Sequence, residues 1–369
     1  MNRHLLEARR TAAALVLPAR RLLAALALGA LGTCAVLAGA GAAGAADAPA
    51  LPEAGSSRLE RPRIWDPMIA GRPYCRLFQD IDGLPQNTIH ALVVDRQGSL
   101  WAGTQDGAAA YDGKVWKRLD LPHPDRSNFI RSMLESRDGS LWIGRQAGGL
   151  ARFRDGQWVD LDFGQTGLEE MRVNALLETQ AADGSPVLWA GTAESGVLRF
   201  DGANWTGFGV AAGLPSAQVW SLLETDDAEG RFLWIGTTAG PATLRLSDGR
   251  IEVPAGAPRD SVSSLLTTVS PAGQRTVWVG TYGGGLLRYS DGVWRRLGPA
   301  ENLPSLFVTD LAASPSGGAD SFWIATDGGG VAQYSGGSIR TVQLGALLAS
   351  RAVYKILETR AEQGAKADW

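Results

Sequence analysis

The stretch Leu141–Trp158, LWIGRQAGGLARFRDGQW, contains the pattern that decides the fold. It reads as a short apolar strand, a glycine turn, a second strand, and an Asp155-Gly156 hairpin that leads into a third strand. Asp-Gly suits a hairpin because both residues tolerate positive φ. Related stretches are LWAGTQDGAAAYDGKVW from Leu100, LWAGTAESGVLRFDGANW from Leu188, LWIGTTAGPATLRLSDGRI from Leu233, VWVGTYGGGLLRYSDGVW from Val277 and FWIATDGGGVAQYSGGSI from Phe322. One unit therefore occurs six times.

The signature tryptophans give the period of this repeat. Those at 101, 142, 189, 234, 278 and 323 are separated by 41, 47, 45, 44 and 45 residues. An apolar segment precedes each, so the predicted first strands are Thr88–Val94, Phe129–Glu135, Val173–Thr179, Val219–Thr225, Val262–Val269 and Phe307–Ala313. Four short strands in a period of roughly 40–50 residues are typical of a β-propeller blade. The sequence therefore predicts an all-β protein, a β-propeller of four-stranded blades.

The two ends of the array indicate how the ring closes. Val353–Thr359 reads as the innermost strand of a seventh blade, and Pro73–Phe78 as an outermost strand without blade-mates. Propellers commonly close by pairing an N-terminal outer strand with C-terminal inner strands. We therefore expect residues 73–369 to form six complete blades and the start of a seventh, incomplete at the C-terminus. A six-bladed ring with an extra tail stays open.

The first 72 residues have a different composition. Basic residues precede an apolar run from Leu22 to about Ala43, and small residues lead to Asp47. This order predicts a signal peptide at 1–46, with an uncleaved N-terminal anchor as the alternative. Residues 47–72, rich in Pro, Ala and Ser, are interpreted as a tether. The expected location is periplasmic. Cleavage would leave Cys75 as a lone cysteine, unable to form an internal disulfide.

The repeat resembles a known family. The segment DGLPQNTIHALVVDRQGSLWAGT (82–104) is similar to the two-component regulator propeller repeat. Comparable segments occur at 172–192 and 213–237. Ile251, Ala325 and Ser335-Gly336 depart from the pattern. The resemblance implies a periplasmic sensor of a regulator tethered to the membrane. Its output, such as a histidine kinase or a diguanylate cyclase, would lie beyond this chain.

No catalytic constellation is evident. His90 and His123 have no partner at metal-ligand spacing, and neither a nucleophile elbow nor a phosphate loop occurs. His90 is interpreted as a packed core histidine, and the repeated tryptophans as fillers between blades. Trp220 lies outside the repeat pattern and is the exception worth testing. We expect no metal and no cofactor. A propeller enzyme (hydrolase, lyase or quinone-dependent) and an envelope scaffold remain alternatives.

The chain has a formal charge of −3, and its sequence has no stripe of basic residues. Both features argue against a nucleic-acid partner. Variable polar residues are expected where the loops before the first strand and after the second strand meet at one rim. These residues are Asn87, Gln105, Asn128, Arg131, Arg145, Asn174, Glu194, Gln218, Tyr282 and Asp327. They predict recognition of a polar ligand, such as a glycan, or of an envelope protein. Solvated loops without a ligand are the alternative, and a homodimer stays open.

Overall fold

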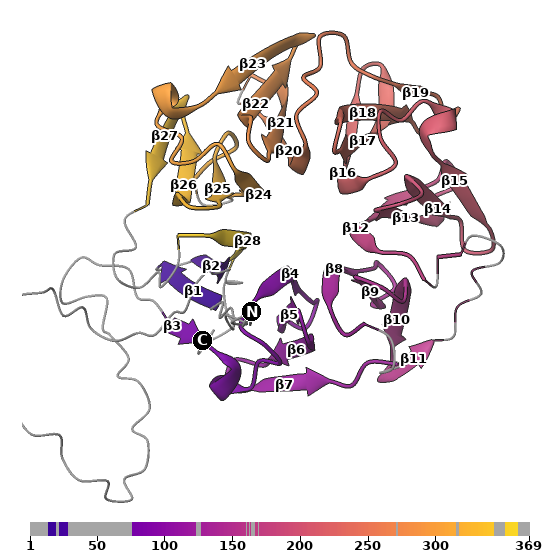
Figure 1. Cartoon of the computed structure of the whole chain (residues 1–369), viewed down its shortest axis with the longest axis vertical. Helices are drawn as coiled ribbons and strands as arrows, with labels where there is room; N and C mark the ends of the chain where they lie inside the picture. The colour runs from indigo at the N-terminus through magenta and orange to yellow at the C-terminus, as the bar shows by residue number, and fades with distance from the viewer. Residues whose placement is uncertain are drawn as a thin grey trace, which may run out of the picture.

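The computed structural model describes residues 76–122, 127–159, 161, 163, 167–168, 170–270, 272–314, 317–342 and 351–360, together with strands at 14–19 and 22–28. These residues form a ring of antiparallel four-stranded sheets (Figure 1), which confirms the predicted β-propeller. The helical elements within these ranges are three 3-10 turns, η1 (Asp80–Asp82), η2 (Val210–Ala212) and η3 (Pro299–Glu301). The predicted tether at 47–72, Cys75 and His123 lie outside the described residues.

Six blades use four consecutive strands each, ordered here from the ring axis outwards. Blades 1 and 2 comprise β4 (Ile89–Val94), β5 (Leu100–Thr104), β6 (Gly107–Tyr111), β7 (Trp116–Leu119) and β8 (Ile130–Glu135), β9 (Leu141–Arg145), β10 (Leu150–Arg154), β11 (Gln157–Val159). Blades 3 and 4 comprise β12 (Val173–Gln180), β13 (Pro186–Thr192), β14 (Val197–Phe200), β15 (Trp205–Phe208) and β16 (Val219–Asp227), β17 (Gly230–Thr237), β18 (Gly240–Arg245), β19 (Ile251–Glu252). Blades 5 and 6 comprise β20 (Val262–Val269), β21 (Arg275–Thr281), β22 (Gly285–Ser290), β23 (Val293–Leu297) and β24 (Val308–Ala313), β25 (Phe322–Thr326), β26 (Gly330–Ser335), β27 (Ser338–Thr341).

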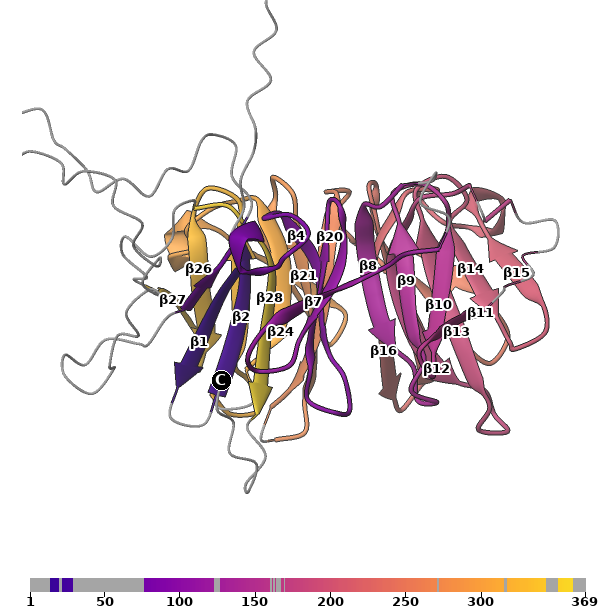
Figure 2. The ribbon, with the colours of Figure 1, turned by 90° about the horizontal axis from the view of Figure 1, so that it is seen from below.

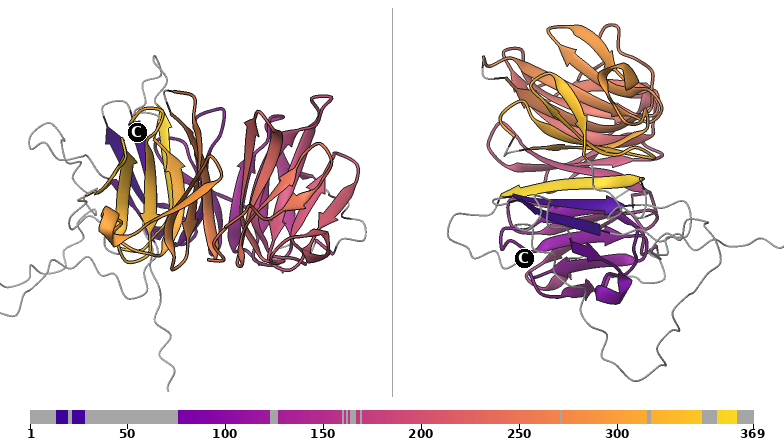
Figure 3. Two further views of the ribbon diagram at one scale, coloured as in Figure 1. Left: turned by 90° about the horizontal axis from the view of Figure 1, so that it is seen from above. Right: turned by 90° about the vertical axis from the view of Figure 1, so that its left-hand side faces the viewer.

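A seventh sheet closes the ring. Its strand order is β28 (Val353–Arg360), β2 (Leu22–Leu28), β1 (Ala14–Ala19) and β3 (Arg76–Phe78). The innermost strand β28 contacts both β24 and β4, and in Figure 3 it lies next to β1 and β2. The inner and outer strands of this sheet are those predicted from the sequence. Its two middle strands come from residues 14–28, within the segment predicted to be a signal peptide. The role of that segment as a signal peptide stays a prediction.

The signature tryptophans fill the spaces between blades. Trp189 of blade 3 packs with Leu233 and Ile235 of blade 4, and Trp278 of blade 5 packs with Phe322 and Ile324 of blade 6. Their indole N–H groups donate to threonine hydroxyls at the end of the first strand of their own blade, 2.9 Å from Nε1 in both cases. The large apolar ring is buried while its one polar group stays satisfied. The interpretation of these tryptophans as fillers is confirmed.

The glycine two residues after the tryptophan is required by the next blade. A Cβ built on Gly280 would lie 2.7 Å from Cγ1 of Val308, the first residue of the next innermost strand. Four other glycines, at 103, 144, 191 and 236, meet the first residue of the following blade at 2.5–2.8 Å in the same way. Blade 6 has Ala325 at this position, and Ala325 packs in one cluster with Val353 of the seventh sheet. The glycines therefore set how closely neighbouring sheets approach.

The Asp-Gly turns are of two kinds. At Asp155-Gly156 and Asp291-Gly292 both residues have positive φ, as predicted for two-residue hairpins. At 112–113, 201–202 and 248–249 positive φ is confined to the glycine, and the loops are longer. There the aspartate side chain accepts backbone N–H groups two or three residues ahead, as Asp112 does from Lys114 and Val115. Side-chain capping thus replaces the second positive φ in these turns.

Candidate functional site

The propeller has two distinct rims, which Figure 2 shows edge-on. We name rim A the edge where each first strand begins and each second strand ends; rim B is the opposite edge. In all six complete blades, the N–H just after the second strand donates to the carbonyl just before the first strand. These bonds join Gln105 to Thr88, Gln146 to Phe129, Ala193 to Arg172, Thr238 to Gln218, Tyr282 to Ser261 and Asp327 to Phe307. The two sets of loops predicted to meet do therefore meet at rim A.

Every innermost strand carries a β-bulge at its second residue, close to rim A. The strand register skips this residue in each of the seven sheets. A bulge leaves one residue unpaired and redirects its side chain. The skipped residues, which we name the bulge ring, are His90, Arg131, Asn174, Trp220, Ser263, Thr309 and Tyr354.

Three small members of the bulge ring join neighbouring blades. Asn174 donates from Nδ2 to the carbonyl of Val219 at 2.8 Å, and Ser263 donates to the carbonyl of Val308 at 2.6 Å. The hydroxyl of Thr309 donates in the same manner to the carbonyl of Val353. In each case the acceptor is the first residue of the next innermost strand. These three side chains are therefore part of the construction of the ring.

The large members of the bulge ring contact one another instead. The guanidinium carbon of Arg131, in blade 2, lies 5.8 Å from the ring centroid of Trp220, in blade 4. His90 of blade 1 stacks on Tyr354 of the seventh sheet at 5.6 Å and 17°, and its ring lies 4.6 Å from that of Phe129. Since blades 2 and 4 are not adjacent, these side chains converge on the ring axis. We name His90, Phe129, Arg131, Trp220 and Tyr354 the bulge cluster.

Arg131 is held in a fixed orientation. Its Nε donates to Oε1 of Gln146 at 2.5 Å, and its guanidinium carbon lies 4.5 Å from the centroid of Phe129. Contact with an aromatic face stabilises a guanidinium through cation–π attraction. Burial, and secondly the charge of Arg172, lower the pKa of Arg131 to about 10. Arg131 stays protonated at neutral pH.

His90 is uncharged in this environment. Burial lowers its pKa to about 3, with further contributions from the charges of Arg131 and Lys355. Its Nε2 lies 3.3 Å from Nε2 of Gln105, a contact that requires His90 to accept or Gln105 to be turned. The imidazole thus acts as a neutral polar group at the ring axis.

The residues predicted for ligand binding divide into buried and accessible groups. Asn87 is 3% exposed, and its Oδ1 accepts the N–H of Asp80. Arg145 is 1% exposed, and its NH1 donates to the carbonyl of Pro122 at 3.0 Å. Asn174 is buried between blades 3 and 4, as described above. All three are committed to the fold, so the candidate site does not include them.

The accessible predicted residues lie around rim A. Gln105 reaches His90 and Asn128 donates to Asp106 at 3.3 Å, while Glu194 and Gln218 are exposed. The Tyr282 hydroxyl donates to Asp327 at 3.1 Å, and the Tyr282 ring packs on Phe307 at 4.9 Å. Tyr282 and Phe307 are 52% and 44% exposed, so blades 5 and 6 present an aromatic pair to solvent at this rim.

Within the bulge cluster, the sequence predicts a ligand-binding role only for Arg131. The sequence indicates a packed core residue for His90 and an exception to the repeat for Trp220, and it predicts no role for Phe129 or Tyr354. One signal could have found His90 and Tyr354. The second residue of each innermost strand differs in every blade, whereas the first is always Ile or Val.

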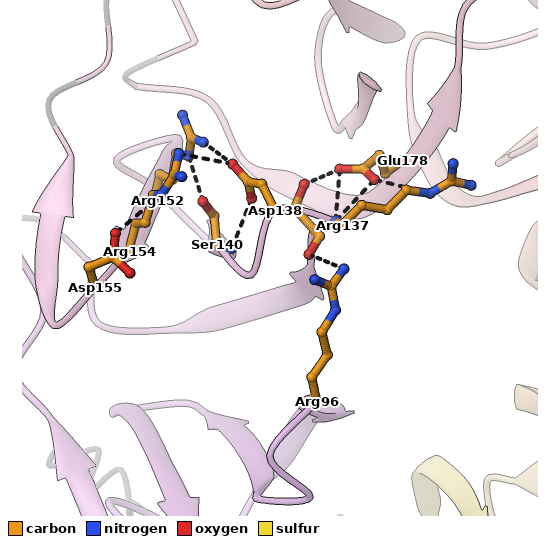
Figure 4. A network of polar contacts seen from close by, with 9 residues as sticks. Arg96, Arg137, Asp138, Ser140, Arg152, Arg154, Asp155 and Glu178 are labelled. Atoms are coloured by element: carbon orange, nitrogen blue, oxygen red, sulfur yellow. Dashed lines mark hydrogen bonds and ion pairs between the residues drawn. The ribbon is translucent and has the colours of Figure 1, made fainter. Parts of the chain in front are cut away.

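Rim B carries a polar network with a structural role (Figure 4). Glu178 of blade 3 accepts the N–H of Arg137 at 3.1 Å and the hydroxyl of Ser136, both in blade 2. Arg96 of blade 1 donates to the carbonyl of Ser136 at 3.2 Å. Asp138 pairs with Arg152 at 2.5 Å within blade 2. These contacts tie the turns of three successive blades together.

The described residues contain no group of three or more His, Cys, Asp or Glu side chains that could hold a metal ion. Over the same ranges, no helix is long and apolar enough to cross a membrane.

Comparisons with known proteins agree with this architecture. The family model of the two component regulator propeller matches residues 83–106 and 125–144. The resemblance seen in the sequence is thereby confirmed for blade 1 and the start of blade 2. No curated protein sequence matches the chain.

Solved structures share the propeller fold. The extracellular domain assigned to a hybrid two component system of B. thetaiotaomicron has 21% identity and a TM-score of 0.56, over 74% of this chain and 37% of that one. A second B. thetaiotaomicron extracellular domain, assigned to a one component system, has 20% identity and a TM-score of 0.54, over 69% and 33%. A surface component of the type-IX secretion system of Porphyromonas gingivalis has 17% identity and a TM-score of 0.54, over 78% and 46%. This chain thus spans less than half of the length of each of these proteins.

Proposed function

We propose that this chain is the recognition part of an extracytoplasmic sensor, and that rim A binds its ligand at the ring axis. One observation carries the proposal. The repeated residues serve packing and turns, whereas the large bulge residues, which differ between blades, converge with Phe129 on one end of the ring as the bulge cluster. A scaffold made of repeats that presents unrepeated side chains at one point suits ligand recognition.

Support for the sensor role comes from the two component regulator propeller repeats and from the extracellular domains that share the fold. In such an arrangement the propeller reports ligand binding to an output domain elsewhere in the regulator. The ligand is a polar molecule, with a glycan or an envelope protein as candidates. Several aromatic faces and few charges at the axis favour a small polar ligand over a large charged one.

A thermal-shift screen of glycans, peptides and purified envelope proteins tests the proposal. A true ligand raises the melting temperature of the chain, because binding to the native state alone stabilises it. Trp220→Leu, at rim A, should abolish this shift. Arg154→Gln, at rim B, serves as the matched control and should leave it intact. A ligand whose shift is lost in Arg154→Gln and kept in Trp220→Leu would refute the location, and no hit in any class would refute the recognition role.

A further inference from the structure

We propose that Arg131 anchors an organic anion, whose carboxylate or phosphate group meets the guanidinium at the rim A end of the ring axis. This inference rests on the proposed function and adds the chemical class of the ligand. Nothing in the repeat itself requires a cation at this position, since the equivalent bulge residues are neutral: His90, Asn174, Trp220, Ser263, Thr309 and Tyr354.

The first argument is the orientation of the guanidinium. Gln146 engages Nε, and the aromatic faces of Phe129 and Trp220 lie 4.5 Å and 5.8 Å from the guanidinium carbon. The terminal nitrogens form no hydrogen bond or ion pair with any residue that the structure describes. A guanidinium fixed through Nε keeps its two terminal nitrogens as a planar fork, the geometry that binds a carboxylate or phosphate in bidentate fashion.

The second argument is the local charge. Several partly buried arginines in the described part of the chain pair with acids, such as Arg152 with Asp138 at 2.5 Å and Arg231 with Glu224 at 2.5 Å, whereas Arg245 and Arg288 form no ion pair there. Arg131 has no such partner among the described carboxylates. The charge that acts on Arg131 is that of Arg172, whose own buried Nε has no hydrogen-bond partner. A half-buried cation beside a second cation is unfavourable unless an anion compensates it.

The third argument is the surface next to the fork. Trp220 and Phe129 flank the guanidinium, and the stacked pair of His90 and Tyr354 continues this aromatic surface around the axis. His90 is neutral at physiological pH, so it adds no competing charge and can hydrogen-bond a polar group of the ligand. The arrangement therefore fits an anionic group attached to a flat, partly apolar body.

The test compares matched small probes on the full chain. Benzoate and phenyl phosphate carry the anion on a flat ring, and benzamide is the neutral isostere of benzoate. Saturation-transfer NMR at about 10 mM of each probe detects millimolar binding. We expect benzoate and phenyl phosphate to bind at least tenfold more tightly than benzamide, the range expected for a charge-assisted bidentate pair.

Variants assign the effect to Arg131. Arg131→Gln should remove the preference for the anions, and Arg131→Lys, which keeps the charge but loses the fork, should keep only part of it. Arg340→Gln, on the outermost strand of blade 6, changes the net charge equally and should have no effect. Unchanged melting temperatures exclude misfolding as the cause.

Two results would overturn the inference. If benzamide and benzoate bind equally, and Trp220→Leu weakens both while Arg131→Gln weakens neither, rim A binds ligands without an anion anchor. The proposed function would then survive without this refinement. If neither anion binds, or if binding persists unchanged in Arg131→Gln, the anion site is refuted regardless of the outcome of the broader ligand screen.

Discussion

Replacement of Gly280 by alanine should destabilise the protein through a single contact between blades 5 and 6. The new Cβ would lie 2.7 Å from Cγ1 of Val308, while its next neighbours are 3.4 Å away. Carbon atoms pack best at roughly 3.5–4.0 Å, so the overlap is about 1 Å. Val308 is completely buried and cannot turn away freely. Overpacking of this kind costs about 1–3 kcal/mol of unfolding free energy.

A double-mutant cycle isolates this contact. Val308→Ala removes two buried methyl groups and should cost about 2–3 kcal/mol, from lost burial plus the cavity left behind. In Gly280→Ala/Val308→Ala the clash disappears, and the new methyl occupies part of the cavity. The double variant should therefore be no less stable than Val308→Ala. The coupling energy between the two substitutions should then be about 1–3 kcal/mol.

Guanidinium unfolding followed by tryptophan fluorescence measures all four proteins. Gly207→Ala in β15 is the control, because its Cβ meets only Leu198 at 3.4 Å and the residue is exposed. Its effect should be neutral or slightly stabilising, since alanine restricts the unfolded chain. Additive losses in the Gly280 cycle, or an equal loss in Gly207→Ala, would refute the explanation of the repeated glycine.

Three further predictions concern other parts of the ring. The pKa of His90 falls from 6.5 to about 3 on folding, so stability is greatest well above pH 6.5 and is lost as the pH falls through 6.5. The unfolding free energy should drop by about 1.6 kcal/mol between pH 6.5 and 5, and His90→Asn should lose this dependence in denaturant titrations. Glu178→Ala removes the acceptors for Ser136 and Arg137, so calorimetry should show a loss of about 1.5–3 kcal/mol of unfolding free energy. Ligand binding at rim A should stay unchanged, and weakened binding would contradict the separation of the two rims. Trp278→Ala should cost about 3–5 kcal/mol in chemical denaturation, and a loss below 1 kcal/mol would contradict the role of Trp278 as a filler between blades.

The fold was predictable because each blade repeats its physical requirements. Trp278 must fill a wedge, Gly280 must admit the next sheet, and Gly292 must turn the chain, so the same letters recur at one period. The predicted first strands agree with the structure to within two residues. The Asp-Gly hairpin at 155–156 was predicted, whereas the longer Asp-Gly turns could not be told apart from it, because an aspartate side chain can cap a longer loop without adopting positive φ itself.

The candidate site was predictable only in its location. The topology places two sets of loops at rim A, but a polar residue in such a loop can be either accessible or buried. Arg145 illustrates the difficulty: it occupies the strand position held by Thr104, Thr192 and Thr237 in other blades, and like them it is buried. The bulges were also hidden, since the bulged residue of β4 and of β8 is a partly buried residue between two buried ones, as in a regular strand.

The seventh sheet shows a related ambiguity. Its middle strands β1 and β2 consist largely of Ala and Leu, a composition that equally suits the apolar core of a signal peptide. Sequencing the N-terminus of the exported protein would decide between the two. A mature chain that begins at Asp47 would lack both strands.

Amide hydrogen exchange with and without the ligand selected by the thermal-shift screen tests the central claim most directly. If rim A recognises the ligand at the ring axis, amide exchange should slow in residues 127–132, which include Arg131, and in residues 216–222, which include Trp220. The turns at 95–99 and 136–140 on rim B should be unaffected. Protection confined to those rim B turns, with none around Arg131 and Trp220, would contradict the account.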